Sequence, residues 1–250
     1  MNTQGVGSQL ALVDMVFPDQ SNHHGTLFGG AAIAALDKLA FILGSKVLRG
    51  AVVTAAVNRI DFHAPVHVGY LTEAVGTVQR VGTRSITIAA ELFAEDLLTG
   101  TRESCLQGEF VMVSTDGQPG LGAASEPKAV DAVCVAEIVF PSHANHRGIL
   151  HGGPAMAWLA KAGFAAATRH ARLPLVMASC TQVDFVAPAR VGDIVEVFAR
   201  PVRVGRRSLT VEVSMFAETP ETGERRLCTR ASAVFVVVED DSAVIRPLDD

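Results

Sequence analysis

The stretch VFPDQSNHHGTLFGGAAIAALDK, residues 16–38, returns later in the chain as VFPSHANHRGILHGGPAMAWLAK, residues 139–161. The two stretches are identical at thirteen positions, which include an asparagine and a pair of adjacent glycines. One difference changes the chemistry, because Asp37 of the first copy is replaced by Ala160 in the second. A duplication that keeps its glycines and loses one carboxylate predicts two similar halves with one set of reactive groups.

The repeat extends far beyond this stretch at a constant offset, 145 − 22 = 123 residues. The same offset aligns Asp61-Phe62 with Asp184-Phe185, and no gap is needed over most of the repeat. Near the end, Phe110 and Phe235 are two residues out of step, which predicts a shift of register there. Such long self-similarity predicts two domains of one fold in tandem.

The segment between the copies, residues 114–133, is rich in Gly, Pro, Ser and Ala, which is a linker composition. We therefore expect a first domain at residues 9–113, a linker at 114–133 and a second domain at 134–239. Each length agrees with the roughly 100–150 residues that are common for one domain.

The composition excludes several classes of protein. With 49% apolar residues in 250 and a net charge of −5, the chain can bury a core and has no basic cluster for nucleic acid. No stretch approaches the roughly 20 apolar residues that span a bilayer, and the start lacks a signal-peptide pattern. We expect a cytoplasmic protein without membrane insertion. The cysteines lack zinc-ligand spacing, so we expect no metal site; they are Cys105, Cys134, Cys180 and Cys228.

In each copy the spacing of the apolar residues changes once along the chain. Residues 31–43 contain neither Gly nor Pro and are rich in Ala and Leu, which predicts a buried helix. After the helix, apolar residues recur at about every second position, and many residues are β-branched. This pattern predicts strands at residues 52–62, 71–81, 84–94 and 102–113. One long helix followed by an antiparallel meander predicts an α+β module in which the sheet wraps the helix.

The motifs occur in a specific order: N-x-x-G-x-x-x-G-G from Asn22, a helix with Asp37, D-F-x-x-P-x-x-x-G from Asp61, and V-G-x-x-S from Val81. This order resembles the acyl-CoA thioesterases of the hotdog fold, and the tandem arrangement resembles their double-hotdog branch. The resemblance implies active sites at the interface of the two units and an acyl-CoA substrate. It implies no cofactor besides the CoA of the substrate. It also implies a homo-oligomer, and a trimer is one form that such chains take.

Thioester hydrolysis needs a donor for the carbonyl oxygen as it becomes an oxyanion, and a group that activates water or attacks directly. The N–H groups at a helix start can be the donor, and glycine there lets a substrate approach the backbone. Gly29 and Gly152 stand at such starts, although a tight turn would also need glycine. Asp37 is the candidate base or nucleophile, because a carboxylate in an apolar helix is costly without a purpose. The alternative is a helix face turned to solvent.

Helix geometry separates the two roles. Gly29 and Asp37 are 37 − 29 = 8 residues apart, which is about 12 Å along a helix. Both groups must reach one carbon, so the donor for Asp37 has to come from the other copy. The first expected site therefore combines Asp37 with Asn145 and Gly152. The second is degenerate and combines Asn22, Gly29 and Ala160, so we expect one working site per chain.

The resemblance assigns further residues. It points to a hydroxyl from the strand after the helix, for which Thr54 is the nearest match. It also places the segment after the V-G turn beside the CoA groove. There arginine suits a phosphate, although an exposed hairpin arginine is an equal alternative. The expected CoA-binding residues are Arg84, Ser85, Arg207 and Ser208.

Three functions are compatible with such a site. The leading hypothesis is an acyl-CoA thioesterase, with Asp37 as general base or as nucleophile. The alternative is a non-catalytic acyl-CoA-binding protein, which the lost second carboxylate makes plausible. A hotdog hydratase would carry a histidine on the helix, and residues 31–43 contain none.

Overall fold

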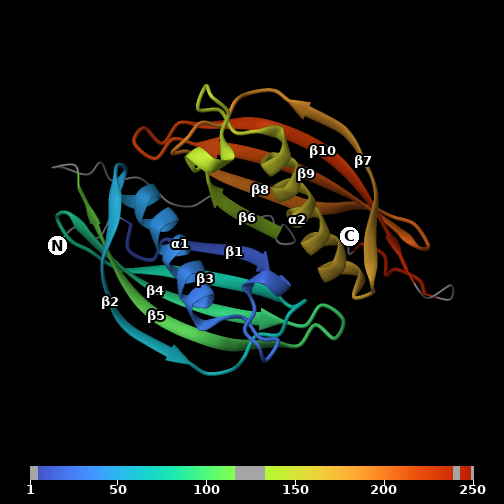
Figure 1. Cartoon of the computed structure of the whole chain (residues 1–250), viewed down its shortest axis with the longest axis horizontal. Coiled ribbons are helices and arrows are strands. Elements are labelled where there is room, and N and C mark those ends of the chain that lie inside the picture. The colour runs from blue at the N-terminus through green and yellow to red at the C-terminus, as the bar shows by residue number, and fades with distance from the viewer. Residues whose placement is uncertain (1–4, 116–132, 239–242, 249–250) are drawn as a thin grey trace. The chain divides into compact units, whose positions relative to one another are not determined.

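Figure 1 shows the computed structural model of the chain, which describes residues 5–115, 133–238 and 243–248. Contacts divide the chain into two compact units, built on the elements β1–β5 with α1 and β6–β10 with α2. Each unit contains one five-stranded sheet that curves around one long helix (Figure 1). The predicted α+β architecture of two tandem units is therefore confirmed. Most of the predicted linker lies outside the described residues.

The first unit has the strand order β1-β3-β4-β5-β2, and every neighbouring pair is antiparallel. Strand β1 was not predicted, and it adds an edge strand beside β3. The elements are β1 (Gln9–Met15), α1 (Gly29–Leu48), β2 (Val52–Phe62), β3 (Leu71–Val81), β4 (Ser85–Glu95) and β5 (Arg102–Ser114). The predicted strands agree with β2–β5 to within one residue at each end.

The second unit repeats this topology with the order β6-β8-β9-β10-β7. A short 3₁₀ turn precedes the helix loop in each unit, at Pro18–Gln20 and Pro141–His143. The elements are β6 (Val133–Ile138), α2 (Gly152–Ala171), β7 (Leu175–Phe185), β8 (Ile194–Val204), β9 (Ser208–Glu218) and β10 (Arg225–Val237).

Both helices are longer than the composition predicts. Helix α1 continues through Gly44, where a Cβ would come within 3.2 Å of the Met112 side chain. Glycine is thus used here for close packing of the helix on the sheet, and it does not end the helix. The helices end instead just before Arg49 and Arg172, which adopt left-handed conformations with φ of 48° and 55°.

The predicted register shift near Phe110 and Phe235 is wrong. Strands β5 and β10 end at Ser114 and Val237, which still differ by 237 − 114 = 123. Both phenylalanines are fully buried, and they occupy positions two apart on the same face of the repeated strand. A large core side chain has therefore moved along the strand without an insertion.

Candidate active site

Asp37 and Thr54 lie together in the first unit. Helix α1 carries the half-buried Asp37, and the next strand, β2, carries Thr54. The Thr54 hydroxyl donates a hydrogen bond of 2.7 Å to Oδ1 of Asp37. The hydroxyl predicted on this strand is thus in direct contact with the candidate carboxylate. The neighbouring Lys38 pairs with Asp14 at 3.8 Å.

The second unit lacks both members of this pair. The offset of 123 residues matches Asp37 with Ala160 and Thr54 with Met177 (54 + 123 = 177). The loss of the hydroxyl was visible in the sequence through the offset, but we had not singled out Met177. The second unit has therefore lost the carboxylate and its hydrogen-bond donor together.

The loop before each helix is organised by an asparagine. Oδ1 of Asn22 accepts from the backbone N–H groups of His24 and Thr26, at 2.9 and 3.3 Å. Oδ1 of Asn145 accepts in the same way from Arg147 and Ile149, at 2.9 and 3.2 Å. The side-chain oxygen is thus a loop cap in both units.

The amide nitrogens of the two asparagines differ. Nδ2 of Asn22 donates to the hydroxyl of Thr26 at 2.9 Å. The matched residue in the second unit is Ile149, which has no hydroxyl. Within the described parts of the chain, Nδ2 of Asn145 has no hydrogen-bond acceptor. One of the two amide hydrogens of Asn22 is thus engaged inside its loop, whereas both hydrogens of Asn145 are available to a ligand.

The two helix starts also differ in how much free space surrounds their glycines. A Cβ at Gly29 would lie 3.4 Å from the Phe62 ring, and one at Gly30 would lie 2.6 Å from the Phe28 ring. At Gly152 and Gly153, no atom of the described residues lies within 4 Å of such a Cβ. Aromatic rings thus crowd the two glycines at the start of α1, whereas those at the start of α2 have open space around them.

The open helix start borders a pocket of about 430 Å³ within the second unit. Its wall includes Ile149, Leu150, Gly152 and Ala155 near the start of α2, and Met215 of β9. The last residue of β7 and the loop after it complete the wall: Phe185, Val186, Ala187, Pro188 and Ala189. These side chains are apolar, which suits a hydrocarbon group placed beside the N–H groups of the helix start.

The predicted CoA-binding residues follow the turns of matched hairpins. A guanidinium nitrogen of Arg84 donates to the carbonyl of Ser114 at 3.1 Å, and one of Arg207 donates to that of Val237 at 3.4 Å. Each arginine thus ties the end of its neighbouring strand, which favours the structural alternative for part of each guanidinium. Ser85 and Ser208 begin β4 and β9. Binding of CoA at these four residues stays a prediction.

The histidines of the loops serve local structure. The His151 backbone N–H donates to the carbonyl of His143 at 2.8 Å. The His143 ring packs edge-on against Trp158 at 5.3 Å. Among the described residues, no three His, Cys, Asp or Glu side chains gather as a metal site would require. No helix in the described ranges is long and apolar enough to cross a bilayer.

The sequence profile of the family described as the thioesterase superfamily matches residues 24–101 and 147–224. An acyl-CoA hydrolase from Agrobacterium tumefaciens has a solved structure similar to this chain, with 37% identity and a TM-score of 0.85. That match covers 96% of this chain and 98% of the other. Together with the two family matches in tandem, this alignment along nearly all of both chains confirms the double-hotdog fold.

Two curated relatives extend the comparison. The chain is 32% identical over 114 residues to the uncharacterized acyl-CoA thioester hydrolase YkhA of Bacillus subtilis, across 45% of this chain and 66% of that protein. It is 22% identical over 284 residues to mouse acyl-coenzyme A thioesterase 11, across 94% of this chain and 48% of that protein. The chain thus spans about two thirds or half of the length of these relatives.

Proposed function

Because the chain belongs to the thioesterase superfamily, we propose that it hydrolyses acyl-CoA thioesters to a free acid and CoA. The observation that carries the proposal is the unequal specialisation of the two units. One unit has a carboxylate bonded to a hydroxyl, and the other has an open helix start with a free amide. These are the two groups that thioester hydrolysis needs.

We propose one composite site per chain, formed by Asp37 with Asn145 and Gly152. Within α1, Asp37 stands 37 − 29 = 8 residues from the helix start, or about 12 Å. That separation is too large for one helix to bring its own carboxylate and its own N–H groups to a single carbon. The start of α2 is the donor that is open, and its first N–H groups have no partner within the helix.

In the proposed reaction, Asp37 takes a proton from water, and the water oxygen bonds to the thioester carbonyl carbon. The carbonyl oxygen becomes an oxyanion that accepts hydrogen bonds at Gly152, where the positive end of the helix dipole stabilises it. The Asn145 amide donates to the water or to the thioester. The C–S bond then breaks, and the CoA sulfur receives the proton. Direct attack by Asp37 through an anhydride uses the same groups.

Thr54 has a positioning role in this scheme. Its hydrogen bond to Oδ1 of Asp37 fixes the carboxylate and leaves Oδ2 to accept the proton. A hydrogen bond to a charged group contributes about 1.5–3 kcal/mol.

The opposite combination of Asn22, Gly29 and Ala160 is proposed to be inactive. Its carboxylate is absent, one hydrogen of its amide is bound to Thr26, and the rings of Phe62 and Phe28 crowd the glycines at its helix start. Three independent changes thus act in the same direction. The cytoplasmic location and the homo-oligomeric assembly expected from the sequence stay predictions.

Two matched substitutions test the proposal. Asp37→Asn should lower kcat by about 10²–10⁴-fold, the contribution of a general base. Asn145→Ala should lower kcat/KM, whereas the matched Asn22→Ala should leave it near the wild-type value. Release of free CoA from a series of acyl-CoAs is the assay. If the wild-type protein binds acyl-CoA but hydrolyses no chain length, the binding-protein alternative is correct. If Asn22→Ala and Asn145→Ala are equally harmful, the one-site assignment is wrong.

A further inference from the structure

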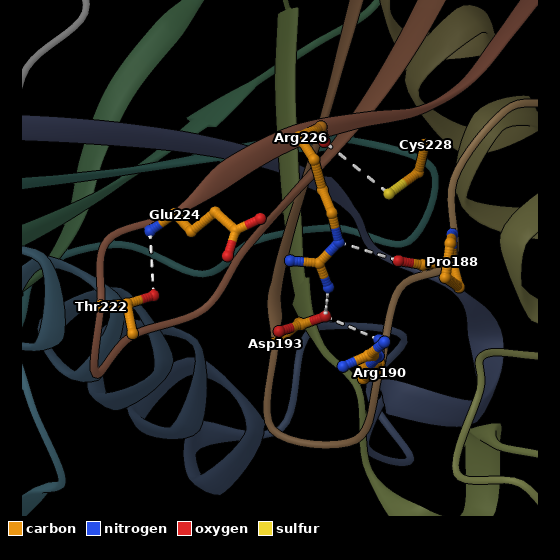
Figure 2. Close-up of polar contacts among 7 residues, drawn as sticks. All are labelled: Pro188, Arg190, Asp193, Thr222, Glu224, Arg226 and Cys228. Atoms are coloured by element: carbon orange, nitrogen blue, oxygen red, sulfur yellow. Dashed lines mark hydrogen bonds and ion pairs between the residues drawn. The ribbon is translucent and has the colours of Figure 1, made fainter.

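The loop after β7 is held by an ion pair that the first unit lacks. Figure 2 shows the Arg226 guanidinium between the Asp193 carboxylate and the carbonyl of Pro188. The distance from Arg226 Nε to the Pro188 oxygen is 2.9 Å. The Asp193 side chain is only 4% exposed, and its Oδ2 also accepts from the Arg190 backbone N–H at 2.6 Å. One partly buried ion pair thus holds the loop at Pro188 and at Asp193.

The same loop is one wall of the pocket beside Gly152. Pro188 lies in that wall, and its carbonyl accepts a hydrogen bond from Arg226. The backbone N–H of Val186, also in the wall, donates to the carbonyl of Cys228 at 2.8 Å. The wall is therefore tied to β10 at Cys228 by its backbone and at Arg226 by a side chain.

The first unit keeps the backbone tie and lacks the ion pair. There His63 donates to the carbonyl of Cys105 at 2.8 Å. The residues matched to Asp193 and Arg226 are Tyr70 and Glu103 (193 − 70 = 226 − 103 = 123). In that unit the Phe62 ring lies against Gly29 at the helix start. The pair thus occurs in the unit whose helix start is open.

We propose that this pocket receives the acyl chain of the substrate, and that Arg226 positions its wall through Asp193 and Pro188. This inference rests on the proposed function and names the part of the substrate that the second unit recognises. A carbonyl at Gly152 would have its hydrocarbon chain beside the apolar side chains of the loop and of Met215. A pocket of about 430 Å³ has the size of about fourteen water molecules at ~30 Å³ each. It therefore takes a chain longer than acetyl.

Burial in such a pocket gives each methylene a measurable effect. The transfer free energy of a buried CH₂ corresponds to about a fourfold change in kcat/KM. We expect kcat/KM to rise by about this factor per added carbon until the pocket is full. The arginine of a partly buried ion pair suits the positioning role, because its guanidinium can hydrogen-bond two partners at once in a rigid geometry.

The first experiment fills the pocket. Ala187→Leu adds three carbons to the wall, so the preference for long chains over acetyl-CoA should fall by roughly 60-fold, which is three factors of four. The matched control is Ala64→Leu in the first unit, which should keep the wild-type profile. Val186→Ala enlarges the pocket from an exposed position, and it should extend the profile to longer chains. Circular dichroism and urea midpoints verify that each variant is folded.

The second experiment loosens the wall. Arg226→Lys keeps the positive charge but loses the two-way bonding, so it should raise KM for long chains by about fourfold per methylene that loses contact. Its effect on kcat with acetyl-CoA should be small. The control is Arg225→Lys, because Arg225 pairs with Glu196 at 3.5 Å and lies over the Phe216 ring. The double variant Asp193→Tyr/Arg226→Glu installs the residues of the first unit and leaves no unpaired carboxylate at position 193.

The outcomes separate the two proposals. If the wild type hydrolyses no acyl-CoA, the proposed function fails, and Kd values for the same chain-length series measured by calorimetry still decide whether the pocket binds the chain. If folded Ala187→Leu keeps the wild-type profile, the acyl pocket lies elsewhere. If Ala187→Leu changes the profile but Arg226→Lys and the double variant do not, Arg226 has no positioning role.

Discussion

Ile149→Thr should give the second unit the hydrogen bond that the first unit has, from the asparagine side-chain amide to a threonine hydroxyl. In the first unit, the Thr26 hydroxyl accepts the Asn22 amide at 2.9 Å. The loops around the two positions have the same backbone hydrogen bonds, so a hydroxyl at 149 should reach Nδ2 of Asn145. The substitution thus engages one of the two amide hydrogens of Asn145 without changing Asn145 itself.

The size of the effect follows from the hydrogen bond that the substrate must displace. A net hydrogen bond contributes about 0.5–1.5 kcal/mol, so kcat/KM should fall by about 2- to 13-fold. Ile149 also lines the pocket, and the smaller side chain has an effect of its own. Ile149→Val has nearly the shape of threonine without the hydroxyl, so the ratio of the two variants isolates the hydrogen bond.

The assay is the initial rate of CoA release, measured below KM with one acyl-CoA for both variants. The reverse change, Thr26→Val, frees the Asn22 amide in the first unit and should leave the rate unchanged. Equal values of kcat/KM for Ile149→Thr and Ile149→Val would show that the free amide has no part in the reaction.

Three further predictions concern the same chain. Thr54→Val should lower kcat by about 10- to 160-fold, the equivalent of a 1.5–3 kcal/mol bond to the Asp37 carboxylate, and Thr54→Ser should recover most of it in steady-state assays. Ala160→Asp in an Asp37→Asn background should restore no turnover, because the Phe62 and Phe28 rings still crowd Gly29 and Gly30 at the start of α1; recovered CoA release would contradict this. Burial raises the pKa of the Cys105 and Cys228 thiols above 9.0, so their stabilisation is complete below pH 9 and is lost as the pH rises through the raised values. The urea midpoint should therefore fall between pH 8 and 10 less steeply in the double Cys→Ala variant.

Much of the fold could be predicted because the repeat samples each pattern twice. Strands β2 and β3 were predicted at their observed bounds, since alternating β-branched residues are bounded by turn residues on both sides. The first helix was predicted to end before Gly44, because glycine commonly marks a helix end. In the structure this glycine lies inside the helix and allows close packing against Met112. Tertiary packing of this kind is invisible in a local pattern.

The candidate site was likewise predicted only in part. The offset alone identified Asp37 and its replacement by Ala160, and the bond from Thr54 to the carboxylate agrees with the resemblance. The free amide of Asn145 was missed, although the offset pairs Ile149 with Thr26 and each lies four residues from its asparagine. The contact of the Phe62 ring with Gly29 could not be predicted, because it joins side chains far apart in sequence. The role of Arg226 was missed for the same reason, because its partners lie more than thirty residues away.

The constant offset of 123 residues also bears on how the two halves can change. When two identical chains assemble, every substitution is made twice, so a ring that closes one helix start closes both. Fusion into one chain removes this constraint, and each half can lose what the other supplies. A saturation mutagenesis scan should therefore give different results in the two units. Positions 160 and 177 should accept many replacements, whereas the matched Asp37 and Thr54 should accept few.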